Sequence, residues 1–161
     1  MRTATEWFEH YGQSHTNPIN KAIHWVCIPL IVVSTLGLLH SVPHPFPHPA
    51  MSWATLTVLA SLGFYLRLSP TIFAGMAVVS SVSLGIVMAI ANAGLPLATI
   101  SAAVFFVAWL AQFVGHRIEG EKPSFFEDLQ FLLVGPAWLL QFVYRKVGIP
   151  VDFRADASPA Q

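Results

Sequence analysis

Three histidines border hydrophobic segments of the chain at positions where their imidazoles could meet. His15 and His24 flank the start of the first hydrophobic segment, and His116 lies at the end of the fourth. Neutral imidazole is the commonest protein ligand for transition metals and suits iron, copper and zinc. If the hydrophobic segments cross a membrane in succession, all three residues reach the same face of it. The pattern predicts a metal site beside a lipid-filled interior.

The stretch from His15 to His24 contains the start of a helix. Asn17 suits the N-cap, and Pro18 suits the first helical position. In one continuous helix, a separation of nine residues would put His15 and His24 on opposite sides. A break before Pro18 lets His15 fold back towards His24, which shares a helical face with Asn20. The alternative is a helix start whose histidine and asparagine side chains simply face water.

A second group of polar residues shares one helical face at the end of the fourth hydrophobic segment. Gln112, His116 and Glu119 follow one another at spacings of four and three residues. A polar side chain in an apolar segment normally requires a partner, so Gln112, like Asn20, could orient a ligating imidazole through a hydrogen bond. Glu119 could be a metal ligand, a hydrogen-bond partner of the ligands or a solvated helix end.

A competing histidine group occupies the segment between the first and second hydrophobic segments. It consists of His40, His44 and His48, separated by alternating prolines. The prolines forbid a helix, and an extended chain would place His44 and His48 on one face. A simple topology puts this group across the membrane from the other three histidines. We expect a polar loop here, with no role in metal binding.

The composition excludes an ordinary soluble domain. Of the 161 residues, 55% are hydrophobic and 10% are charged, whereas soluble domains carry roughly 25% charged residues. From His10 to His116 there is no Asp or Glu, and Lys21 and Arg67 are the only Lys or Arg residues, as expected for a membrane-embedded stretch. A net charge of zero without a basic patch argues against nucleic acid as a partner. The single cysteine, Cys27, is expected to be a small core residue.

The hydrophobic pattern predicts an all-α integral membrane protein with a four-helix bundle. Four segments approach the roughly 20 apolar residues of a spanning helix, namely 23–39, 51–68, 72–91 and 95–114. A fifth apolar run, 129–144, contains Gly135 and Pro136 and should form an additional C-terminal helix that is kinked and interfacial or re-entrant. A capping box, Ser124 to Glu127, opens it. We expect a single membrane domain with an N-terminal arm (1–17), the helical bundle (18–146) and a flexible tail (147–161).

The distribution of Lys and Arg predicts the orientation, because these residues accumulate on the cytoplasmic side of membranes. Loops 40–50 and 92–94 contain neither residue type. The other connections and the termini carry them, at Arg2, Lys21, Arg67, Arg117, Lys122, Arg145 and Lys146. Four crossings with both termini in the cytoplasm, in a bacterial inner membrane or the endoplasmic reticulum, satisfy every position. The fifth apolar run then does not cross.

Several common chemistries lack their residues in this sequence. The paired Glu-x-x-His motifs of di-iron bundles are absent, as are acids within the spans for proton relays and the Gly-x-Ser-x-Gly elbow of hydrolases. A histidine-dominated site remains. Two other classes also stay open: a membrane protein that binds haem or quinone through histidines, and a non-enzymatic membrane scaffold.

Two segments resemble the signature segments of a known family. They read YGQSHTNPINKAIHWVCIP (11–29) and WLAQFVGHRIEGEKP (109–123), and the likeness in size and span pattern covers roughly residues 5–150. The family consists of short membrane proteins whose fungal members are Fe(II)-dependent dioxygenases of 2-hydroxy fatty acids, acting in α-oxidation during phytosphingosine breakdown. The resemblance implies that His15, His24 and His116 bind Fe(II). It also implies that the chain uses O₂ to shorten a long-chain 2-hydroxy fatty acid by one carbon.

This chemistry suits the residues. A 2-hydroxy acid can chelate Fe(II) through its carboxylate and hydroxyl, and histidine ligation leaves open positions for that chelate and for O₂. A metal at the interface would meet the polar head of a lipid whose tail lies among membrane lipids. The aromatic residues Phe105, Phe106, Trp109 and Phe113 could line an acyl slot, pack internally or face lipid. The sequence leaves the oligomeric state open, a homo-oligomer included.

Overall fold

The computed structural model describes residues 4–13, 15–48, 51–122 and 131–151, and within them all regular structure is helical. The helices are α1 (Ala4–Gln13), α2 (Pro18–Ser41), α3 (Trp53–Leu68), α4 (Pro70–Asn92), α5 (Leu97–Glu119) and α6 (Phe131–Val147). The all-α prediction is confirmed. The predicted capping box at Ser124 to Glu127 and residues 152–161 of the predicted tail lie outside the described residues.

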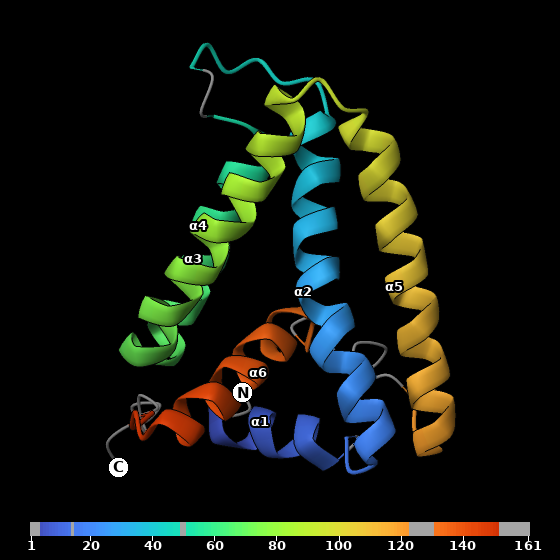
Figure 1. Ribbon diagram of the computed structural model, residues 1–161. Coiled ribbons are helices and arrows are strands. Elements are labelled where there is room, and N and C mark those ends of the chain that lie inside the picture. The colour runs from blue at the N-terminus through green and yellow to red at the C-terminus, as the bar shows by residue number, and fades with distance from the viewer. Residues whose placement is uncertain (1–3, 14, 49–50, 123–130, 152–161) are drawn as a thin grey trace.

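The four central helices run up and down in succession (Figure 1). Helix α2 packs most extensively against α5, and α3 packs against α4. The two pairs lie close together at the end that carries loops 42–52 and 93–96, which we call the loop end. They diverge towards the other end, where α1 and α6 run across the molecule. This second end, the α1–α6 end, is therefore more open than the parallel-sided four-helix bundle that the sequence suggests.

Local sequence signals begin and end these helices. The Asn17 side chain accepts a hydrogen bond from Ile19 N at 2.9 Å, and Pro18 is the first residue of α2, as predicted. Ser69 alone separates α3 from α4 and caps α4. Gly120 ends α5 with a φ of 84°, a left-handed conformation that favours glycine. The connections from α3 to α4 and from α4 to α5 are therefore short, and these three helices run antiparallel to their neighbours in sequence.

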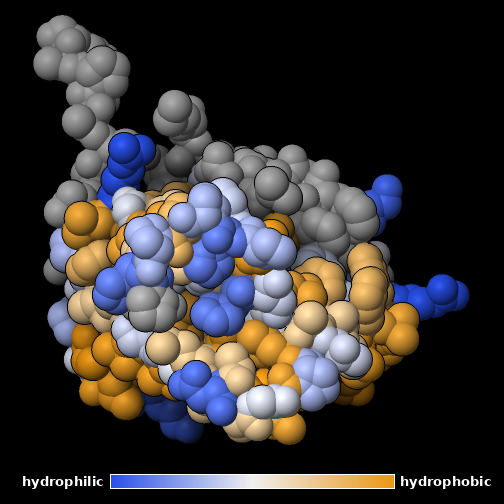
Figure 2. Space-filling view, turned by 90° about the horizontal axis from the view of Figure 1, so that it is seen from above, coloured by the Kyte–Doolittle hydropathy of each residue, from blue (hydrophilic) through white to orange (hydrophobic). Residues whose placement is uncertain are grey.

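Within the described residues, three helices are long and apolar enough to cross a membrane, which indicates a membrane protein. They are α2, α4 and α5, with 24, 23 and 23 residues. Helix α3 is apolar but has only 16 residues, or ~24 Å at 1.5 Å per residue, against a hydrocarbon core of about 30 Å. The predicted second span is thus shorter than a full crossing. Seen from the loop end, hydrophilic residues gather over the helix ends and hydrophobic ones dominate the rim (Figure 2).

The interior has two hydrophobic clusters. The cluster at the loop end contains residues from all four central helices, namely Leu36, Ala54, Val58, Val87 and Leu97. The cluster at the α1–α6 end is larger and includes Phe8 and Tyr11 of α1, several residues of α2–α4, and Val134, Ala137, Trp138 and Leu139 of α6. The transverse helices therefore fill the space that opens where the central pairs diverge.

Helix α6 corresponds to the fifth apolar run and continues through Pro136. It is bound to the α3–α4 pair by two hydrogen bonds, from Tyr65 Oη to Leu133 O at 2.9 Å and from Tyr144 Oη to Thr71 O at 3.2 Å. The helix crosses the α1–α6 end instead of running beside α2 (Figure 1). This position fits the expectation that the fifth apolar run does not cross the membrane alongside the four central helices.

Candidate metal centre

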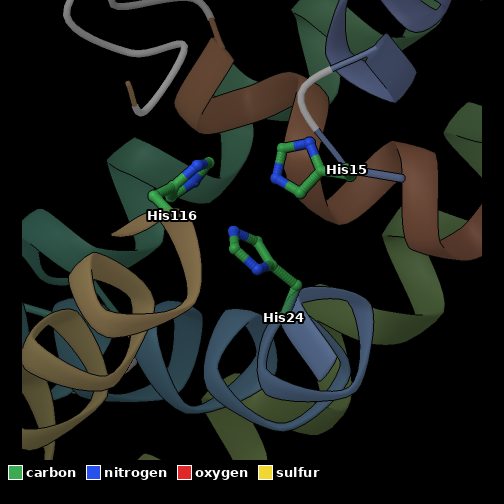
Figure 3. A group of neighbouring side chains, drawn as sticks. All are labelled: His15, His24 and His116. Atoms are coloured by element: carbon green, nitrogen blue, oxygen red, sulfur yellow. The ribbon is translucent and has the colours of Figure 1, made fainter. Parts of the chain in front are cut away.

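The structure brings together the three histidines that the sequence singled out (Figure 3). His15 lies in the link between α1 and α2, His24 in the second turn of α2, and His116 in the last turn of α5. One ring nitrogen from each lies within 4.8 Å of the others. Their exposed fractions are 1%, 1% and 5%. Three elements thus contribute one imidazole each to a single buried point.

Hydrogen bonds to the main chain orient two of the rings. His15 Nδ1 lies 2.6 Å from Tyr11 O, and His24 Nδ1 lies 2.9 Å from Asn20 O. A carbonyl oxygen only accepts hydrogen bonds, so both Nδ1 atoms carry the proton and donate it. The Nε2 atom of each neutral ring then keeps its lone pair for another partner. This is the usual arrangement of a histidine that binds a metal through Nε2.

Two ring nitrogens of the cluster lack the partners that buried polar atoms normally have. His15 Nε2 and His116 Nδ1 are buried and have no hydrogen-bond partner in the part of the chain that the structure describes. Such orphaned atoms are rare because burial without a partner costs free energy. A metal ion bound by the cluster would satisfy His15 Nε2, the nitrogen that the hydrogen bond to Tyr11 O leaves available. The donor set and its unsatisfied atoms therefore fit a transition metal.

The protonation state of His15 also suits metal binding. Burial, followed by the neighbouring imidazole of His24, lowers the pKa of His15 to about 3, and the hydrogen bond to Tyr11 O opposes this only in part. The ring is therefore neutral at physiological pH, which is the form that binds metals.

Aromatic rings pack against the cluster and exclude water from it. Tyr11 stacks on His15 with a centroid distance of 4.2 Å and an interplanar angle of 14°. Trp138 of α6 lies 5.6 Å from the same ring. Burial raises the pKa of Tyr11 above its usual value, so its hydroxyl stays protonated. Sequence reasoning missed both residues, because their role depends on how α1 and α6 pack.

The other polar residues predicted for the site take different positions. Asn20 provides the carbonyl that accepts from His24, while its side chain donates to Glu119 Oε2 at 3.0 Å. Glu119 lies at the end of α5 and contacts the α1–α2 link; within the described residues, the group that could hold an ion contains the histidines alone. Gln112 is buried, and within the described residues it forms no hydrogen bond with His116.

A cavity of about 50 Å³ extends from the histidines along α2 and α5. At its polar end lie His24, His116, Gln112 and Tyr11. The remaining lining residues are apolar, namely Ile28, Ile31, Val32, Trp109, Leu132, Gly135 and Pro136. Within the part of the chain that the structure describes, the lining includes no Lys, Arg, Asp or Glu. The site therefore combines a small polar region with an apolar wall built from α2, α5 and α6.

The sequence comparison decides the family. The sequence model of the family described as "2-hydroxy-palmitic acid dioxygenase Mpo1-like" matches residues 1–147. The chain belongs to the Mpo1-like family. This match confirms the resemblance carried by the two signature segments. No curated protein and no solved structure shows significant similarity to the chain.

Of the four aromatic residues considered for an acyl slot in this Mpo1-like chain, Trp109 lines the cavity. Phe106 and Phe113 are 70% and 43% exposed on the outside of α5, where lipid would surround them. Cys27 is buried and free, as expected for a core residue.

The second histidine group of this Mpo1-like chain lies at the loop end. His40 Nδ1 is 3.2 Å from Ser52 Oγ, and His44 stacks on Phe46 at 5.4 Å. His48 is exposed. Within the described residues these three do not form a group that could hold an ion.

Proposed function

We propose that this protein is an Fe(II)-dependent dioxygenase that shortens a long-chain 2-hydroxy fatty acid by one carbon. The observation that carries the proposal is the convergence of three buried imidazoles, two of which, His24 and His116, line the polar end of a mostly apolar cavity. Membership in a family named for a 2-hydroxy-palmitic acid dioxygenase supports the substrate class.

His15, His24 and His116 would hold the iron, with His15 and His24 using the Nε2 atoms that their main-chain hydrogen bonds leave available. Three histidines leave coordination positions for other ligands, as in other non-haem iron oxygenases. The bound iron would activate O₂ and coordinate the carboxylate and hydroxyl of the substrate. Haem suits the site poorly: its iron offers two axial positions, whereas three rings meet here with centroids 4.3–5.0 Å apart.

The cavity would orient the substrate by polarity. Its polar end receives the acid head, and the apolar wall from Ile28 to Val32 receives the first part of the acyl chain. Val32 lies eight residues beyond His24 in α2, or ~12 Å along the helix. Among the described residues, no Lys or Arg lines the cavity to balance a carboxylate, so that charge would fall to the metal. The Tyr11 hydroxyl and the Gln112 amide can donate hydrogen bonds to the head.

The overall reaction balances without an added reductant. One 2-hydroxy acid and one O₂ give the acid that is one carbon shorter, CO₂ and water. The bond between C1 and C2 breaks, and the substrate itself supplies all four electrons that reduce O₂. The 2-hydroxyl is essential because it makes C2 readily oxidised and provides the second arm of the chelate.

We also propose that α2–α5 cross the membrane, with α3 as a short span, and that both termini lie on the cytoplasmic side. The described parts of α1 and α6 both lie at the end that holds the histidine cluster (Figure 1). The metal would then lie at the cytoplasmic interface. A lipid substrate could reach it with its head at the interface and its tail in the bilayer.

The direct test is turnover by purified, iron-loaded protein in detergent. We expect O₂ consumption with 2-hydroxypalmitate, and a fatty acid shorter by one carbon as product, measured by mass spectrometry. Palmitate, which lacks the hydroxyl, should not react. If neither acid is shortened, or both are shortened equally well, the proposed reaction is wrong.

A further inference from the structure

The carboxylate of Glu119 binds the segment that links α1 to α2. It accepts hydrogen bonds from Thr16 N at 2.8 Å, from Asn17 N at 3.0 Å to each oxygen, and from Asn20 Nδ2 at 3.0 Å. The Thr16 hydroxyl donates to it as well. Hydrogen bonds to an ionised group are about twice as strong as neutral ones. Four donor groups from one short segment therefore converge on a single side chain of α5.

This contact matters because His15 lacks the support that fixes the other two histidines. His24 and His116 lie on α2 and α5, which pack against each other more extensively than any other pair. His15 lies between helices, and its own hydrogen bonds, from its N to Gly12 O at 3.1 Å and from Nδ1 to Tyr11 O, reach back to α1. Glu119 instead fixes the two residues that follow His15 to the end of α5.

Both oxygens of Glu119 are already occupied by these donors, so the carboxylate is poorly placed to bind a metal as well. We propose that Glu119 is a positioning residue that clamps the Thr16–Asn17 link onto α5 and so holds His15 in register with His24 and His116. The inference rests on the proposed metal site. It also resolves the three roles that the sequence left open for this residue.

The test is the affinity of the purified full chain for Cu(II), which binds nitrogen sites tightest among the divalent metals, measured by chelator competition. Glu119→Gln keeps the volume but puts an amide NH₂ against backbone donors. We expect a loss of roughly 10–100-fold, the usual cost of removing a hydrogen-bonding partner around a metal site. In a His15→Ala background the same substitution should change affinity by less than about twofold, because coupled residues are not additive. Glu121→Gln, an exposed neighbour, is the matched control.

The outcomes separate the clamp from the metal site itself. If Glu119→Gln weakens Cu(II) binding equally in the parent and in the His15→Ala background, Glu119 is a ligand and the clamp is wrong. Unchanged affinity in Glu119→Gln, with metal bound normally by the parent, would overturn the clamp alone. A parent that binds no metal would overturn both proposals.

A second variant covers the case in which Glu119→Gln folds poorly. Thr16→Val removes only the hydroxyl donor and leaves the backbone bonds intact. We expect a few-fold loss of affinity that disappears in the His15→Ala background, and faster amide exchange at Asn17 in the metal-free protein. Slow exchange together with parental affinity would contradict the clamp.

Discussion

The two ends of this molecule both carry histidines, but only the α1–α6 end gathers three of them into one cluster. At the α1–α6 end the rings come from three elements, and their exposed fractions are 5% or less. At the loop end they come from the end of α2 and the short proline-rich stretch that follows, and His48 is exposed. The comparison shows that neighbouring histidines in a sequence do not make a site. A site forms where separate elements bring their histidines together and bury them away from water.

The packing of α2 against α5 explains the difference. Gly115 precedes His116, and a Cβ at this position would collide with Asn20 Oδ1. The missing side chain lets the two helices approach closely beside the cluster. The loop-end group has no such convergence, because alternating prolines keep that segment extended and limit it to local contacts such as His40 with Ser52.

The largest expected effect is the loss of a histidine at the α1–α6 end. His24→Ala or His116→Ala should weaken metal binding by more than the roughly 10–100-fold typical of partners around a metal site and should abolish turnover. Folding should largely survive, because each residue lies near a helix end. Metal content and circular dichroism of the purified variants check this. A His24→Ala protein with full iron content would show that the cluster at the α1–α6 end does not hold the iron.

A smaller effect is expected when the helices that gather the cluster are pushed apart. Gly115→Ala forces Asn20 to shift and should reduce metal affinity by about tenfold. Gly85→Ala is the control, because a Cβ there meets nothing within 4 Å, and replacing a helical glycine by alanine should be neutral or stabilise the protein by up to about 1 kcal/mol. Equal metal affinities in the two variants would show that close packing at Gly115 does not build the site.

The next effect concerns the channel that leads away from the cluster. Val32→Phe fills the far part of the cavity and should lower turnover of long 2-hydroxy acids several-fold while sparing short ones, with metal content unchanged. Phe106→Ala, on the exposed face of α5, should change neither. Competition between acids of different chain length measures the preference. An unchanged preference would place the acyl chain elsewhere.

The two ends should also differ in the side of the membrane that they face. Single cysteines at Ser41 and Asn92 should react with an impermeant thiol reagent from one side, and cysteines at Gln13 and Arg117 from the other. All four positions are exposed, and the native Cys27 is buried. Labelling of Ser41 and Gln13 from the same side would overturn the four-crossing topology.

The smallest expected effect is at the loop end. His44→Ala and His48→Ala should leave metal content, turnover and thermal stability close to those of the parent, because both residues lie outside the cluster. A loss of metal in either variant comparable to that in His24→Ala would mean that the buried cluster is not the site.

Much of the histidine cluster could be predicted from the sequence because its signals are local. Asn17-Pro18 marks the helix break that lets His15 fold back towards His24. The lengths of the hydrophobic segments predict which histidines lie on the same side of the membrane. Tyr11 and Trp138 could not be found in this way. Nothing in their own segments shows that α1 and α6 run across the end of the central helices, since this depends on packing between elements far apart in sequence.

The limits of the fold prediction have the same origin. Four apolar segments suggested a regular bundle, but periodicity does not reveal that the helix pairs diverge and admit α6 (Figure 1). Gln112 was expected to hydrogen-bond an imidazole because it lies on the face of His116; the structure places it in the cavity lining instead. Helical spacing predicts which residues share a face, but not which partner each one takes.

The central question is whether the buried histidine cluster holds a single non-haem iron. Iron analysis and an absorption spectrum of the same purified sample test this. We predict about one iron per chain without a Soret band, and loss of that iron in His15→Ala, His24→Ala and His116→Ala but not in His44→Ala. A Soret band, or iron retained in all four variants, would contradict the account.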